Sequence, residues 1–167
     1  MNRFIFIFSL LLLMISSSCI TEDEPDTTSL KPGDQCPEFS VKMHDGSIVT
    51  TADLKGEKSI ILFFNTSCAD CRSELPQMQR VYEHIIAGRI PARLLCISRA
   101  EREESIERFW QENGLTLPYS AQEDRTVYNL FAQSVIPRIY ILSPDLTIIR
   151  AWGDNPVPTA EEIIGCL

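Results

Sequence analysis

Two spacings of apolar residues divide most of the chain into expected strands and helices. A short apolar run is typical of a central strand covered on both faces, whereas apolar residues three or four positions apart are typical of a helix with one buried side. The first spacing predicts strands at 59–65, 93–98, 117–120, 139–142 and 147–151. The second predicts helices at 71–86, 101–113, 124–132 and 159–166.

A segment of alternating polarity precedes these elements and predicts a β-hairpin. Phe39, Val41 and Met43 alternate with polar residues, Asp45-Gly46 is a strong turn pair, and an apolar segment resumes at Ile48. The order of strand, helix, strand and helix, followed by a hairpin and a last helix, predicts an α/β domain. Its central β-sheet would be mixed and flanked by helices, with the hairpin added at the N-terminal side.

The first residues have the pattern of a targeting segment. Arg3 precedes an apolar run at 4–15, which is too short for a membrane span, and small residues follow at 16–18. A cysteine directly after three small residues resembles the lipobox of bacterial lipoproteins, in which the signal is cleaved before a cysteine that is then acylated. The resemblance implies a signal peptide at 1–18 and a lipid anchor to a membrane at Cys19. The alternative is an ordinary cleaved signal peptide with an incidental cysteine.

Composition and charge narrow the class of protein. Residues 19–35 are polar and acidic, which predicts a flexible tether followed by one folded domain at 36–167. With 167 residues, 44% of them hydrophobic, the chain is long enough for a substantial core. The formal net charge of −8 gives no electrostatic support for binding to nucleic acid.

The six cysteines do not form an obvious disulfide framework. Cys96 lies in an expected strand, where cysteine usually acts as a small buried apolar residue. A bridge between Cys36 and Cys166 is one option that the sequence leaves open. His44 and His84 are isolated, and no second cysteine pair completes a zinc site, so we expect neither a metal nor a cofactor.

Cys68 and Cys71 are the strongest chemical signal in the chain. They lie two residues apart, where an expected strand ends and an expected helix begins. The unpaired N–H groups and partial positive charge of a helix start favour a thiolate over a thiol. We therefore expect Cys68 to be the exposed nucleophile and Cys71, one turn further in, to attack a mixed disulfide on Cys68. Half of a zinc site and a structural disulfide are the alternatives.

Further motifs extend this signal over nearly the whole domain and carry a family resemblance. They are Pro37-Glu38-Phe39, Asp45-Gly46, Leu54-Lys55-Gly56, the block 63–76 and Val135-Ile136-Pro137. Together they resemble thioredoxin-fold thiol–disulfide oxidoreductases of the AhpC/TSA and Redoxin-like superfamily, specifically the tethered extracytoplasmic kind similar to TlpA and the cytochrome-c-maturation thioredoxins. The resemblance implies a thioredoxin fold and the reduction of disulfides in exported proteins. It also implies a membrane or periplasmic electron donor and a place in the bacterial cell envelope.

The resemblance assigns roles to particular residues. Pro76 matches the helix-bending proline of the fold, and Glu74 matches a glutamate that assists proton transfer near the dithiol. Pro137 matches the cis-proline, and the backbone beside it, at Ile136, would pair with a substrate peptide.

Two departures from the family pattern bear on the direction of the reaction. Ser67 replaces the aromatic residue that commonly precedes the first cysteine, and Asp70 lies between the two cysteines. A carboxylate in this position repels a nearby thiolate, by about 1 kcal/mol in a partly solvated site. We therefore expect the dithiol form to be disfavoured, which would make the protein a reductant.

Two other functions remain open at this point. A thiol peroxidase of the related peroxiredoxin family would need a threonine three residues before its reactive cysteine, where this chain has Asn65. A non-catalytic lipoprotein with the same fold would have no use for intact Cys68, Cys71, Glu74 and Pro137.

Overall fold

A computed structural model of the protein describes residues 29–167. The predicted signal peptide at 1–18, Cys19 and the first part of the predicted tether lie outside the described residues. In the part of the chain that is described, no helix has both the length and the apolar character that crossing a membrane requires.

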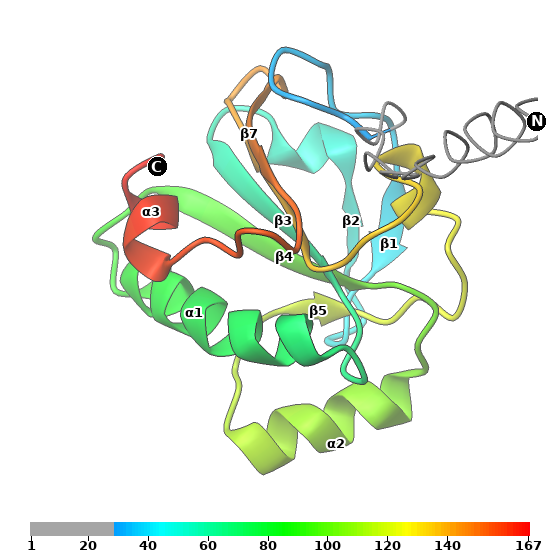
Figure 1. Ribbon diagram of the computed structural model, residues 1–167. Coiled ribbons are helices and arrows are strands. Elements are labelled where there is room, and N and C mark those ends of the chain that lie inside the picture. The colour runs from blue at the N-terminus through cyan, green and yellow to red at the C-terminus, as the bar shows by residue number, and fades with distance from the viewer. Residues whose placement is uncertain (1–28) are drawn as a thin grey trace, which may run out of the picture.

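A five-stranded mixed sheet forms the centre of the domain, as predicted (Figure 1). The central strand β3 (Lys58–Phe64) is parallel to β4 (Ala92–Ser98) and antiparallel to β6 (Arg138–Leu142). The outer strands are β5 (Tyr119–Ser120), beside β4, and β7 (Ile148–Trp152), beside β6. Every residue of β3 after Lys58 is buried, as its continuous apolar sequence predicts.

Side chains from both faces of β3 join the sheet to the layers around it. Because successive strand residues point to opposite faces, Phe63 and Phe64 pack on different sides. Phe63 lies 4.9 Å from the ring of Phe131, and Phe64 lies 5.1 Å from the ring of Trp110. Trp110 belongs to α2 (Glu103–Asn113), and α1 (Ala69–Ile86) packs with α3 (Ala160–Ile164) (Figure 1). The helices therefore flank the sheet, as the sequence predicts.

The predicted N-terminal hairpin is present as a separate two-stranded sheet. Strands β1 (Ser40–Lys42) and β2 (Ile48–Thr50) pair antiparallel, and Gly46 has a φ of 85° in the turn between them. A 3-10 helix, η1 (Thr51–Leu54), follows directly. The Asp45-Gly46 pair therefore marked the turn correctly.

The predicted start of the domain at residue 36 is too late. The backbone N–H of Leu30 donates to the Phe131 carbonyl (2.8 Å), and the N–H of Gly33 donates to the Ile148 carbonyl (2.9 Å). Gln35 also forms a β-bridge with Thr147. Residues 30–35 are thus attached to the domain by backbone hydrogen bonds, which the polar composition of this segment does not reveal.

The predicted helix at 124–132 is wrong for most of its length. Only a 3-10 helix, η2 (Tyr128–Leu130), forms in this segment. Asp124 does not cap a helix at 124: its carboxylate accepts from the N–H of Thr126 (2.8 Å), and its carbonyl accepts from the N–H of Ala100 (2.9 Å). These local and long-range bonds replace helical ones at the start of the segment.

The remaining described cysteines are Cys36, Cys96 and Cys166, and each is free. Cys36 and Cys166 are free thiols, so the bridge between them that the sequence left open is not formed. Cys96 is fully buried in β4, as predicted, and burial raises the pKa of its thiol. Burial likewise raises the pKa of Cys36 to about 12, which keeps both groups as neutral thiols.

Candidate active site

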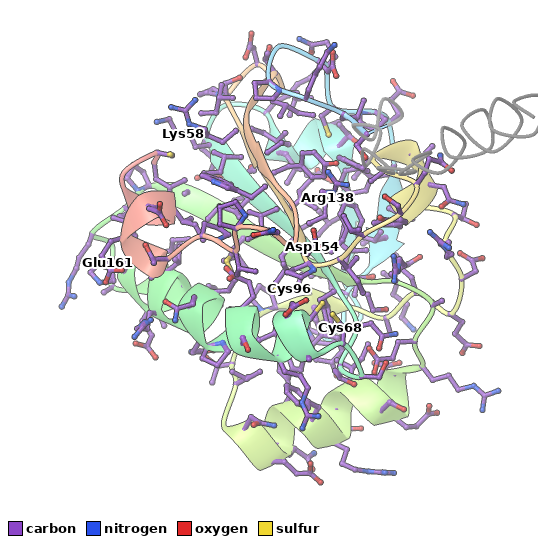
Figure 2. All side chains as sticks on the ribbon, in the orientation of Figure 1. Lys58, Cys68, Cys96, Arg138, Asp154 and Glu161 are labelled. Carbon is purple, nitrogen blue, oxygen red and sulfur yellow. The ribbon has the colours of Figure 1, made fainter. Side chains whose placement is uncertain are left out.

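Cys68 lies at the N-terminal end of α1, where the sequence predicts it (Figure 2). It is half-buried and has extended backbone dihedrals, as is usual for the residue that caps a helix. Its sulfur accepts a hydrogen bond from the backbone N–H of Cys71, with an Sγ···N distance of 3.4 Å. Because this N–H would otherwise be unpaired at the helix start, the same group is available to stabilise a Cys68 thiolate.

The turn between β3 and α1 is built by Asn65. Its carboxamide oxygen accepts from the N–H and from the hydroxyl of Ser67, at 2.9 and 2.5 Å. Its backbone carbonyl accepts from the N–H of Cys68 at 3.1 Å. These bonds fix the direction in which the chain enters the helix, and with it the position of Cys68.

The carboxylate of Glu101, which was not predicted to belong to the site, stabilises the same turn by hydrogen bonds. Glu101, only 9% exposed, accepts from the N–H of Thr66 at 2.8 Å with one carboxylate oxygen and from the Thr66 hydroxyl with the other. Glu101 follows β4, which is parallel to β3, and parallel strands end at the same edge of a sheet. From the sequence alone, Glu101 was interpreted only as a charged residue of a helix. The expectation that two parallel strands end at the same edge of the sheet could have placed it near Thr66.

Cys71 is fully buried behind Cys68. Burial is the largest cause that raises the pKa of its thiol, and a hydrogen bond with the Cys68 side chain raises it further. A backbone hydrogen bond with Asn65 and the charge of Arg99 act in the opposite direction. Cys71 is therefore a protonated thiol in the reduced protein, placed against the sulfur of the more exposed Cys68.

Glu74 lies three positions after Cys71, on the same side of α1. Its side chain is fully buried, and neither carboxylate oxygen has a hydrogen-bond partner among residues 29–167. Burial raises the pKa of this carboxyl from 4.5 to about 8. Near neutral pH the group therefore holds a proton but can release it, as a group that transfers protons must.

The structure brings Ile136 and Pro137 to the other side of Cys68. The Ile136–Pro137 peptide bond is cis, as the resemblance implied, and the Ile136 carbonyl lies 3.5 Å from Cys68 Sγ and accepts its S–H. A second cis bond, between Asn155 and Pro156, had no signal in the sequence. Residues 68 positions apart in the chain thus form one site, with the thiol on one side and a backbone edge on the other.

Nothing in this site has the form of a metal centre. Over residues 29–167, no three side chains of His, Cys, Asp or Glu come together as they would around an ion. Two thiols at a helix start, a buried carboxyl and a backbone edge are instead suited to exchange between thiols and disulfides.

Comparison with known proteins agrees with this chemistry. Residues 32–151 match the AhpC/TSA family. The chain belongs to this family. Among curated relatives, the thiol-disulfide oxidoreductase ResA of Oceanobacillus iheyensis is 28% identical over 152 residues, which cover 86% of this chain and 78% of the relative.

Solved structures establish the fold of this family member. The thioredoxin domain of a thiol-disulfide oxidoreductase from Bacteroides vulgatus superposes with a TM-score of 0.67 at 23% identity, covering 81% of this chain and 99% of that one. StoA from Bacillus subtilis superposes with a TM-score of 0.65 at 23% identity, covering 79% and 96%. The fold is therefore the thioredoxin fold, as the sequence motifs indicated.

Proposed function

We propose that this protein is an enzyme that exchanges thiols and disulfides, and that it reduces disulfides in exported proteins. The observation that carries the proposal is the pairing of Cys68 with Cys71. The Cys68 sulfur is accessible, it accepts a hydrogen bond from the first turn of α1, and the buried Cys71 thiol lies directly behind it. The names of the curated relatives support the same class of reaction.

The reaction follows from these positions. The Cys68 thiolate attacks one sulfur of a substrate disulfide, forms a mixed disulfide and releases the other substrate sulfur as a thiolate. Cys71 then gives up its proton and attacks Cys68 Sγ, which releases the second substrate thiol and leaves a Cys68–Cys71 disulfide. The substrate gains two electrons, the protein loses two, and a membrane or periplasmic donor must restore the dithiol.

With a pKa of about 8, a minority of the Glu74 carboxyls is ionised near neutral pH, and in that form Glu74 is suited to accept the proton of Cys71 in the second step. Cys71 is buried and protonated, so its attack on the mixed disulfide needs a base inside the protein. The Glu74 carboxyl, one turn along the same face of α1, is also buried and has a pKa near the working pH. Cys68, Cys71 and Glu74 are therefore the proposed catalytic residues.

Ile136 and Pro137 are suited to bind the substrate. The Ile136 carbonyl lies 3.5 Å from Cys68 Sγ, on the side from which a substrate sulfur could approach. An extended peptide beside this backbone could form main-chain hydrogen bonds without regard to its sequence. Such binding suits an enzyme that acts on several exported proteins.

We further propose that the protein works at a membrane surface of the bacterial cell envelope, anchored by a lipid on Cys19. The support is the order of a charged residue, an apolar run, small residues and a cysteine in the first 19 positions. The acidic segment that follows would keep the domain near the membrane without inserting it.

An assay of two substrates separates this function from the peroxidase alternative. A peroxiredoxin would need threonine at position 65, where Asn65 instead builds the turn before Cys68. We expect the purified protein to reduce insulin disulfides with dithiothreitol as the donor and to consume hydrogen peroxide no faster than free cysteine does. Rapid peroxide consumption that survives replacement of Cys71 with serine, together with no reduction of insulin, would contradict the proposal.

The redox potential tests the proposed direction. Asp70 is exposed in the first turn of α1, two residues after Cys68, and we propose that its negative charge makes the reduced form of the pair less favourable. We expect equilibrium with glutathione to give a potential near or below the thioredoxin value of about −270 mV. Asp70→Asn should raise the potential by about 20 mV, which corresponds to about 1 kcal/mol. Glu83→Gln, at the far end of the same helix, is the control and should leave the potential unchanged. A wild-type potential near −120 mV would show that the protein is an oxidant instead.

A further inference from the structure

The segment directly before Pro137 is held by side chains from two other parts of the chain. Three consecutive backbone carbonyls, those of residues 133–135, each accept a hydrogen bond from a different side chain. The next carbonyl, that of Ile136, is the one that faces Cys68 Sγ. Arg125 Nη2 donates to the Gln133 carbonyl (2.6 Å), Arg99 Nη1 donates to the Ser134 carbonyl, and the Tyr128 hydroxyl donates to the Val135 carbonyl (2.7 Å).

Both arginines also contact the ring of Tyr128. The guanidinium carbon of Arg99 lies 5.1 Å from the centre of the Tyr128 ring, and that of Arg125 lies 5.4 Å from it. Both cations are within the range of attraction to an aromatic face. Tyr128 is buried and meets Phe63 of the central strand edge-on, with ring centres 5.4 Å apart. The group formed by Arg99, Tyr128 and Arg125 is therefore fixed to the core of the sheet.

Arg99 in addition reaches the other side of the active site. Its backbone carbonyl accepts from the side-chain amide of Asn65 (3.1 Å), and its N–H donates to the Phe64 carbonyl (2.8 Å). Asn65 builds the turn that positions Cys68. One residue thus contacts both the turn before the nucleophile and, through its guanidinium, the segment before Pro137.

We propose that Arg99 is a positioning residue that, with Tyr128 and Arg125, sets the distance between the substrate-binding backbone at 133–136 and the sulfur of Cys68. Arg99 would act through that backbone, separately from the effect of its charge on the Cys71 thiol, which is absent when Cys71 is replaced. The hydrogen bond from Arg99 to the Ser134 carbonyl matters because it fixes the distance between the backbone at 133–136 and Cys68. A peptide bound along that backbone can present its disulfide to Cys68 only at the correct distance. The inference rests on the proposed exchange of disulfides with peptide substrates.

Two reactions of Cys68 distinguish a positioning role from a general structural one. In a Cys71→Ser background the reaction stops at the mixed disulfide, so the first step can be measured alone. A peptide disulfide needs the backbone at 133–136 for binding, whereas iodoacetamide, followed at Cys68 by mass spectrometry, does not. We expect Arg99→Met to raise the peptide concentration for half-maximal rate about tenfold, as loss of a charge-assisted hydrogen bond implies, without slowing alkylation.

Two further variants complete the experiment. Tyr128→Phe removes only the bond to the Val135 carbonyl and should show the same selective loss for the peptide, which keeps the test valid if Arg99→Met folds poorly. Arg93→Met, at the opposite end of β4 in an exposed ion pair with Glu57, should change neither reaction. An unchanged reaction with the peptide in both Arg99→Met and Tyr128→Phe, or equal slowing of both reactions, would overturn the proposal. If Cys71→Ser alone forms no mixed disulfide with the peptide, the proposed function itself fails.

Discussion

Replacing Cys68 with serine is expected to abolish the reduction of insulin disulfides, with a fall in rate of at least about a thousandfold. Loss of a covalent nucleophile costs more than this in other enzymes. A serine hydroxyl cannot form the mixed disulfide, and the remaining thiol of the pair, Cys71, is fully buried and protonated. The turnover of insulin by the purified variant, with dithiothreitol as donor, measures the effect.

The comparison with other cysteines makes this result specific. Cys166→Ser changes a half-buried thiol next to the C-terminus and should leave the rate unchanged. Cys71→Ser should still react once with a disulfide substrate but should not turn over. Insulin reduction by the Cys68→Ser protein at a rate near that of the wild type would show that another group carries the reaction.

Replacing Glu74 with glutamine is expected to stabilise the protein at alkaline pH. The carboxyl has a pKa of about 8 when folded, against 4.5 when exposed. Below pH 4.5 both states hold the proton, so the group does not affect stability there. Between pH 4.5 and 8 only the unfolded state releases the proton, so the wild type loses up to about 1.4 kcal/mol of stability per pH unit. Above pH 8 both states are ionised and the loss is complete.

The glutamine variant avoids this loss because its amide does not ionise. At pH 8 its free energy of unfolding should exceed that of the wild type by about 4 kcal/mol, and at pH 4 the two should be nearly equal. Urea denaturation of the reduced proteins at both pH values measures the difference. Glu83→Gln, an exposed position on the same helix, is the matched control and should show no such pH dependence. Equal slopes of stability against pH for Glu74→Gln and wild type would mean that Glu74 is ionised in the folded protein at neutral pH.

The same variant separates the proposed chemical role of Glu74 from its effect on stability. An amide cannot accept the proton of Cys71, so release of substrate from the mixed disulfide should slow much more than formation of that disulfide. Stopped-flow measurements with a fluorescent disulfide peptide resolve the two steps. Equal slowing of both steps would contradict the proposal that Glu74 accepts the proton of Cys71.

The parts of the site that the sequence predicted are those that lie in continuous motifs. Cys68 caps α1, and Cys71 and Glu74 lie in its first two turns, so their spacing along the chain fixes their spacing in space. Pro137 was found through its match to a family motif. The structure has these cysteines and the glutamate at the start of α1 and a cis bond before Pro137, and the roles assigned to these residues stay predictions.

The parts that the sequence missed depend on contacts between distant segments. Glu101 and Arg99 look like ordinary charged residues beside a helix, and their partners become visible only when β4 is laid parallel to β3. The start of the domain was misjudged for the same reason, because the mostly polar segment 30–35 is held by backbone hydrogen bonds to β7 and Phe131. Local polarity predicts neither kind of contact.

Capture of a mixed disulfide tests the central claim most directly. The Cys71→Ser protein is mixed with an unfolded, disulfide-containing protein, quenched with acid and digested, and the linked peptides are identified by mass spectrometry. The proposed function predicts a substrate peptide joined to Cys68, released by dithiothreitol and absent when Cys68 is also replaced. The absence of any adduct, or adducts joined only to Cys36, Cys96 or Cys166, would contradict it.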